Sequence, residues 1–300
     1  MTTQDDDLDR NQASIDDRSR RDFVALSTAA GVIAATRPVS GAELQVVEKD
    51  VDIRTPDGTC DAAFIYPATG QHPGVLIWTD IFGLRPVFRE FGKRLAAEGY
   101  AVLVPNPFYR TAKAPVISDV SSFNFQDPAS RAKLTQFTGP INAAGAIESD
   151  AKAYVAYLGG QHQVSKTRKM GTQGYCMGGP LVVKTAAAVP DRIGAGASFH
   201  GGGLVTDKPD SPHLLIPKMK SRMYLAVAAS DDTKQPDAKD TLRKAFADAH
   251  LQAEVTVYPG TIHGWCVRDM PPQNGKPIYS RPDAERAWGH LLSLYKTSLA

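Results

Sequence analysis

Short apolar runs alternate with helical patterns along most of the chain. Residues 74–79 and 101–104 are uninterrupted apolar runs, as expected of strands buried on both faces of a parallel sheet. Between them, residues 86–98 begin at a proline and stop before a glycine, which indicates a helix. A strand, a helix and a second strand in this order predict a right-handed crossover within a parallel sheet.

The alternation continues over the rest of the chain. Residues 46–53 and 60–66 flank a Thr-Pro-Asp-Gly turn and predict an antiparallel hairpin. Further strands are expected at residues 169–174, 193–199, 222–229 and 254–258, and further helices at residues 140–158, 178–188, 237–249 and 283–298. We therefore expect the α/β fold class, with a mostly parallel central sheet and helices on both of its faces.

One segment interrupts this rhythm. Residues 111–139 have no strong hydrophobic period and make a connection much longer than the usual few residues. Long insertions of this kind often form lids over a binding site. The alternative is a surface excursion without a role.

The amino-terminal segment differs in composition from the rest. The apolar run 23–35 is 13 residues long and follows an Arg-Arg pair. It resembles a twin-arginine export signal, because it is shorter than the roughly 20 residues of a membrane span and small residues follow it up to Ala42. We predict a signal at residues 1–42 and a folded domain at residues 43–300. The signal implies the export machinery as a partner, a periplasmic or exported mature protein, and no stable membrane insertion. The alternative is an amphipathic helix in a cytoplasmic protein.

Charge and cysteine content argue against two classes of protein. The 34 basic and 32 acidic residues leave a net charge of +2 without a basic cluster, so nucleic acid is not an expected partner. Cys60, Cys176 and Cys266 are too few, and odd in number, for a disulfide framework. At least one thiol is therefore expected to be free.

One of the cysteines lies in a pattern typical of a catalytic nucleophile. Residues 174–178 read GYCMG and lie between an expected strand and an expected helix. In such a nucleophile elbow the flanking glycines are needed because a Cβ would collide with a neighbouring strand or helix. The amino terminus of the following helix also favours a thiolate. Cys176 is therefore the candidate nucleophile, and the alternative is a buried cysteine between packing glycines.

An acid and a histidine follow the cysteine in the chain order of this type of active site. The strand at 222–229 leads into Asp231 and Asp232, and the two carboxylates compete for one role at the carboxyl edge of the sheet. The strand at 254–258 leads to His263, which is the candidate base. His200 also follows an expected strand and is the nearest alternative.

Three motifs give the chain a family resemblance. GYCMGG at 174–179, DIFG at 80–83 and IHGW at 262–265 are similar to motifs of the dienelactone hydrolase family, and the resemblance extends over residues 45–298. It implies an α/β-hydrolase fold and a carboxylic ester hydrolase that needs no metal and no organic cofactor.

The resemblance also implies a catalytic triad. The family site consists of a cysteine, an aspartate and a histidine, which implies Cys176, Asp232 and His263 here. Asp232 is preferred to Asp231 because Pro236 follows it in the manner of the family. The other aspartate is then expected to cap a helix or a turn.

Further residues have roles that the resemblance implies. Asp80 stands where the family has a glutamate that contacts the resting thiol, and its side chain is one methylene shorter. The backbone N–H groups of Ile81 and Met177 are expected to form the oxyanion hole. Arg110 and Arg268 are candidates for binding a substrate carboxylate, because a guanidinium pairs with it in a bidentate fork. The alternative for each arginine is a solvated surface residue.

The predicted function is hydrolysis of a lactone or activated ester through a thioester acyl-enzyme. The predicted partner is a small-molecule lactone or ester, and the protein is expected to be a monomer or a small homo-oligomer. One alternative is a thiol redox enzyme with Cys60 or Cys266 as the resolving thiol. The other is a non-catalytic carboxylate-binding protein on a hydrolase fold.

Overall fold

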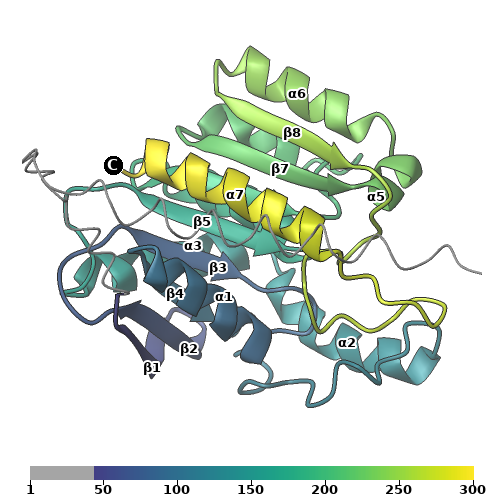
Figure 1. Ribbon diagram of the computed structural model, residues 1–300, viewed down its shortest axis with the longest axis horizontal. Coiled ribbons are helices and arrows are strands. Elements are labelled where there is room, and N and C mark those ends of the chain that lie inside the picture. The colour runs from purple at the N-terminus through teal and green to yellow at the C-terminus, as the bar shows by residue number, and fades with distance from the viewer. Residues whose placement is uncertain (1–43) are drawn as a thin grey trace, which may run out of the picture. The chain divides into compact units, whose positions relative to one another are not determined.

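An eight-stranded β-sheet forms the centre of the structure, a computed structural model that describes residues 44–300. Its strands are β1 (Val46–Thr55), β2 (Gly58–Pro67), β3 (Gly74–Trp78), β4 (Ala101–Pro105), β5 (Met170–Tyr175), β6 (Ile193–Phe199), β7 (Arg222–Ala228) and β8 (Ala253–Tyr258). They lie in the order β1-β2-β4-β3-β5-β6-β7-β8 (Figure 1). The β1–β2 and β2–β4 pairs are antiparallel, whereas all other neighbours are parallel. The predicted fold class is therefore confirmed.

Helices cover both faces of this sheet. They are α1 (Pro86–Ala97), α2 (Pro128–Ile141), α3 (Ala146–Gly160), α4 (Gly178–Ala188), α5 (Ala229–Lys234), α6 (Ala238–Asp248) and α7 (Arg281–Ser298), with a 3-10 helix at Pro212–Lys218. In Figure 1, α1 and α7 lie in front of the sheet. Buried side chains of α1 and α7 share one apolar core, and those of α3, α4 and α6 belong to a second core on the other face.

The strand register brings the candidate site residues to one edge of the sheet. In the parallel part, Trp78 pairs with Gly174, and Tyr175 pairs with Phe199. The last residue of β7 likewise pairs with the last residue of β8. The segments that follow these strands therefore leave the sheet side by side, at its carboxyl edge, where open α/β sheets bind ligands.

Two helices differ from the sequence-based expectation. A single helix was expected at 140–158, but α2 runs through Pro140 to Ile141 and α3 begins only at Ala146. The break between them contains Gly145, the residue before α3, whose φ of 77° is a left-handed conformation that cannot continue a helix and suits glycine. Asp127 caps α2 by accepting hydrogen bonds from two amides of its first turn, so part of the long insertion is helical.

The insertion 111–139 packs against the loop that follows β3. The ring of Phe82 lies 5.0 Å from that of Phe123 and 5.7 Å from that of Phe125, measured between ring centroids. The two insertion rings are 4.9 Å apart. These three aromatic rings therefore connect the insertion directly to the segment that contains Ile81.

The predicted export signal at 1–42 lies outside the described residues, so it stays a prediction. Among residues 44–300, no helix has the length and apolar character needed to cross a membrane.

Candidate active site

Cys176 occupies a strained turn between β5 and α4. Its φ is 53°, a left-handed conformation that is rare for residues other than glycine. The glycines on either side allow this turn, because a Cβ at Gly174 would overlap the carbonyl of Gly178, and one at Gly178 would lie 2.6 Å from the Trp78 oxygen. The Cys176 N–H donates to the Phe199 oxygen at 3.0 Å. The side chain thus leaves the carboxyl edge of the sheet, as the elbow pattern predicts.

His263 lies beside this cysteine on the loop that follows β8. Its N–H donates to Ser230 Oγ at 3.0 Å, and its Nδ1 lies 2.7 Å from Asp231 Oδ2. The Cys176 side chain also lies close enough to the imidazole to affect its pKa. Burial by itself lowers the pKa of His263, but the hydrogen bond with Asp231 and the interaction with Cys176 outweigh it and raise this pKa to about 10. The raised pKa favours the protonated imidazole beside the sulfur.

The residue that contacts His263 is Asp231, so the prediction of Asp232 was wrong. Asp232 Oδ1 accepts a hydrogen bond from Lys239 Nζ at 2.9 Å instead. Both aspartates belong to α5, a short helix that was not expected from the sequence. Successive side chains of an α-helix point in directions about 100° apart. One aspartate therefore faces the histidine, while its neighbour faces α6.

Asp80 is bound to an arginine rather than to the thiol. Its two oxygens lie 2.7 Å and 2.9 Å from the Arg85 guanidinium, and Oδ1 also accepts the Phe82 N–H at 2.9 Å. Arg85 pairs in turn with Asp269. Among the described residues, no hydrogen bond joins Asp80 to Cys176, so the predicted contact with the thiol is not present. The fully buried Asp80 carboxylate and its ion pair instead fix the loop after β3.

The two predicted oxyanion-hole amides lie at neighbouring strand ends. Ile81 follows β3, and Met177 immediately precedes α4. The contact of Gly178 with the Trp78 oxygen brings these two segments together. Within residues 44–300 neither amide donates a hydrogen bond to another protein group. Their role in holding an oxyanion stays a prediction.

The two predicted substrate-binding arginines lie in different parts of the structure. The Arg110 guanidinium is occupied by two carboxylates: it pairs with the buried Asp150 at 2.8 Å and with Asp57 at 2.5 Å. The expectation of a guanidinium free for substrate was therefore wrong, because two acids already neutralise it. Arg268 is exposed and lines two cavities, neither of which is lined by Cys176 or His263. Its contact with substrate stays a prediction.

The candidate base His263 also contacts a second histidine, His200. Its ring lies edge-to-face with that of His263, with 4.9 Å between the centroids. Its Nδ1 lies 3.3 Å from the Cys266 sulfur, and its φ of 40° is again left-handed. Burial, and secondarily the charge of His263, lowers the pKa of His200, so this ring is neutral. From the sequence His200 was only an alternative base, and the signal for it was its position after β6.

The chemistry that these residues allow is attack on a substrate by a nucleophilic side chain. No group of three or more metal-ligating side chains occurs among residues 44–300. A cysteine on a strained turn after β5, an acid after β7 and a histidine after β8 have the chain order and sheet positions of an α/β-hydrolase. The fold and this arrangement define that class of enzyme.

Comparison with known proteins narrows the class to a family. The model of the dienelactone hydrolase family matches residues 60–299, and the chain belongs to this family. The carboxymethylenebutenolidase of Rhodococcus opacus is 28% identical over 71% of this chain and 78% of its own length. A candidate carboxymethylenebutenolidase from Synechocystis is 28% identical over 77% of this chain and 89% of its own length.

A solved structure agrees with these relatives at the level of the fold. The crystal structure of a candidate dienelactone hydrolase from Klebsiella pneumoniae superimposes with a TM-score of 0.69 at 19% identity. It covers 84% of this chain and 99% of the other. The family and its named relatives identify the protein as a carboxylic ester hydrolase.

Proposed function

We propose that this protein hydrolyses a lactone or an activated ester through a triad of Cys176, His263 and Asp231, with a thioester acyl-enzyme as the intermediate. The observation that carries the proposal is the series formed by the Cys176 side chain, the His263 ring that interacts with it and Asp231, whose Oδ2 lies 2.7 Å from His263 Nδ1. Such a series aligns a nucleophile, a base and an orienting acid.

In the first step, the thiolate of Cys176 attacks the carbonyl carbon and forms a carbon–sulfur bond. The electron pair of the carbonyl moves to its oxygen, which the N–H groups of Ile81 and Met177 stabilise. When the carbon–oxygen bond of the ester breaks, His263 donates its proton to the leaving oxygen. Asp231 holds the imidazole in the required orientation throughout.

In the second step, water resolves the thioester. His263, now neutral, accepts a proton from the water as the oxygen attacks the acyl carbon. The carbon–sulfur bond then breaks, and the carboxylic acid leaves while Cys176 returns as a thiolate beside the protonated His263. No redox partner takes part, so the atoms and charges balance over the cycle.

The sulfur nucleophile favours particular leaving groups. A thiolate is itself a good leaving group, so the tetrahedral intermediate returns to the ester when the departing alkoxide is poor. An enolate, as released from an unsaturated lactone, competes better with the sulfur. We therefore propose unsaturated lactones or aryl esters as the substrate class, and slow turnover of simple alkyl esters.

Substitution of the nucleophile tests this proposal. We expect Cys176→Ala to lower kcat on an activated lactone by on the order of 10³-fold or more, because a covalent step is lost. Cys60→Ala is the matched control, since that buried sulfur interacts with Tyr154 on another part of the fold. Mass spectrometry of rapidly quenched native protein should reveal the acyl group on Cys176. Unchanged turnover in the alanine variant would refute the assignment.

The environment of the other cysteines argues against the redox alternative. Cys60 accepts a hydrogen bond from Tyr154 at 3.2 Å, and Cys266 lies 3.3 Å from His200. Burial raises the pKa of both thiols, to about 12 for Cys60, so neither is readily ionised for exchange with Cys176. The acyl-enzyme experiment also separates hydrolysis from a purely carboxylate-binding role.

A further inference from the structure

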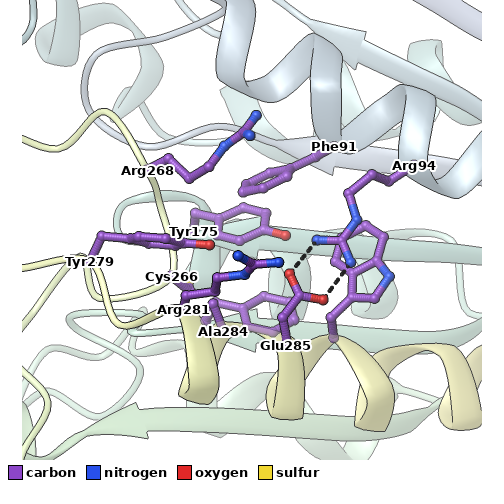
Figure 2. Close-up of a pocket in the computed structure, with 11 residues that line it drawn as sticks. Phe91, Arg94, Tyr175, Cys266, Arg268, Tyr279, Arg281, Ala284 and Glu285 are labelled. Carbon is purple, nitrogen blue, oxygen red and sulfur yellow. Dashed lines mark hydrogen bonds and ion pairs between the residues drawn. The ribbon is translucent and has the colours of Figure 1, made fainter.

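A cavity that the hydrolytic mechanism does not use lies between α1, α7 and the segment 266–281. Its volume is about 440 Å³, within the range of small-molecule sites. Its lining side chains come from these three segments and from the ends of β5 and β6 (Figure 2). None of Cys176, Asp231 and His263 lines it.

Aromatic side chains form the walls of this cavity. The rings of Phe91 and Tyr175 are stacked, with centroids 5.0 Å apart and planes 25° apart. The Trp288 ring lies 6.0 Å from that of Phe91. All three side chains line the cavity. Tyr175 is already stacked between Phe91 and Phe199, and the Arg94 guanidinium covers the Trp288 ring, so the rings line the cavity mainly with their edges. A planar ring can therefore pack there edge-to-face, a geometry that aromatic pairs prefer.

The charge of the cavity is positive. Three arginines line it against one acid, Glu285. Arg94 neutralises this acid through hydrogen bonds of 3.1 Å and 2.8 Å. Within residues 44–300, Arg268 and Arg281 have no acidic partner within ion-pair distance. The lining therefore has an excess of two positive charges beside its aromatic walls.

The position of Arg281 suits the capture of an anion. Figure 2 shows its guanidinium reaching into the cluster between Tyr279 and Glu285. Arg281 is also the first residue of α7, an 18-residue helix whose amino terminus carries a partial positive charge. A carboxylate at this place gains a bidentate guanidinium contact and the field of the helix.

We propose that this cavity is a second binding site, for a planar aromatic carboxylate. The ring of the ligand packs against the edges of Phe91 and Trp288, and its carboxylate pairs with Arg281. The site is separate from the hydrolytic centre, although its wall residue Tyr175 directly precedes Cys176. A ligand with only an aromatic ring, or with only a carboxylate, would make just one of these two contacts.

Titration calorimetry of the full-length protein with 2-naphthoate tests the site. We expect saturable binding of one molecule per chain. Cyclohexanecarboxylate, which has the charge but not the aromatic ring, should bind about tenfold more weakly or worse, because it cannot form aromatic contacts. Absence of saturable binding of 2-naphthoate would overturn the proposal.

Two variants locate the bound molecule. Arg281→Ala should weaken the binding of 2-naphthoate about tenfold or more, through loss of the bidentate pair. Lys296→Ala is the matched control, since it removes one positive charge from the exposed far end of the same helix and should leave the affinity unchanged. Ala284→Trp should abolish binding by filling the cavity while both free arginines remain. Native affinity in Arg281→Ala and Ala284→Trp would place the ligand elsewhere.

Alkylation of Cys176 with iodoacetamide separates this site from the hydrolytic centre. The treated protein should lose turnover and keep its affinity for 2-naphthoate. Loss of affinity after alkylation would show that the molecule binds at the nucleophile, and the proposal of a second site would fail. Because this readout is binding alone, it is independent of whether the proposed acyl-enzyme forms.

Discussion

The choice between two adjacent aspartates decides the candidate triad. The carboxylate of Asp231 lies 2.7 Å from His263 Nδ1, whereas that of Asp232 pairs with Lys239. A carboxylate at Nδ1 fixes the tautomer and the orientation of the imidazole, and it stabilises the ring when protonated. The two side chains are chemically identical, so only their directions on α5 differ.

Substitution of each aspartate therefore has a different consequence. We expect Asp231→Asn to lower kcat by on the order of 10²- to 10⁴-fold, because the amide holds the wrong tautomer of His263. Asp232→Asn should stay within about threefold of the native protein, since it removes only a partly exposed ion pair. Steady-state kinetics on one activated ester compares the two variants. Equal losses in both would contradict the assignment of Asp231.

The raised pKa of His263 makes a contribution to stability that depends on pH. The pKa is about 10 in the folded protein, against roughly 6.5 in an unfolded chain. The folded state therefore binds more protons between these values, and the free energy of unfolding falls as pH rises through that window. The contribution is complete below about pH 6.5 and is lost once pH exceeds about 10.

Denaturant unfolding at several pH values measures this effect. The native protein should lose stability between about pH 7 and pH 10, and His263→Gln should lose less over the same interval. The difference between the two curves removes the contributions of other groups. Parallel curves would show that His263 does not titrate in this window.

The buried pair of Asp80 and Arg85 has a structural consequence. The Arg85 side chain is 3% exposed and that of Asp80 is fully buried, so removing the charge of Asp80 leaves the buried guanidinium with only its partly exposed partner Asp269. We expect Asp80→Asn to lower the free energy of unfolding by about 3 kcal/mol. Asp269→Asn is the control, because that carboxylate is 38% exposed and its loss should cost about 1 kcal/mol or less. Thermal and denaturant unfolding check both values.

At the scale of elements, the insertion 111–139 acts on the loop after β3. Phe123 packs on Phe82, next to Ile81, whose amide is a proposed oxyanion donor. A shift of such a donor by about 1 Å can lower a rate by up to about 100-fold. The packing of the insertion can therefore affect the reaction rate, although none of its own residues belongs to the proposed triad.

A truncation in the aromatic contact tests this connection. We expect Phe123→Ala to lower kcat about tenfold, because the loop that holds Ile81 loses its packing partner. Thr135→Ala, on the exposed side of α2, should leave kcat unchanged. Both variants should unfold within about 2 kcal/mol of the native protein. Native kcat in Phe123→Ala would assign the insertion no role in this reaction.

Most helices and strands were predictable from the sequence, because the signals for them lie within a few neighbouring residues. The elbow was recognisable because its glycines, strand and helix are contiguous, and α4 begins and ends where the sequence indicated. The expected helix at 140–158 was wrong at its start, because Pro140 lies within α2 and the break falls at Gly145. The helix α5 was missed, since its six residues, five of them polar, have no apolar stripe and lack a helical signature.

At the scale of the whole molecule, we propose that residues 1–42 direct export. Fractionation of the native host should place the protein in the periplasm or outside the cell, shortened by 42 residues at its amino terminus. Replacement of both Arg20 and Arg21 by Lys should retain the full-length chain in the cytosol, because the arginine pair is the recognised feature. A full-length cytosolic protein in the unmodified host would refute export.

The sequence by itself determined the sheet, the elbow and the positions of Cys176 and His263, because these depend on periodicity and on neighbouring residues. Only the tertiary structure decided the partners of the charged side chains. Arg85 pairs with Asp269 across 184 residues, and Arg110 pairs with Asp150 across 40. The direction of Asp231 and the aromatic cavity beside α7 depend in the same way on packing between distant segments. No local pattern specifies such contacts, since each is settled only when the chain has closed around its sheet.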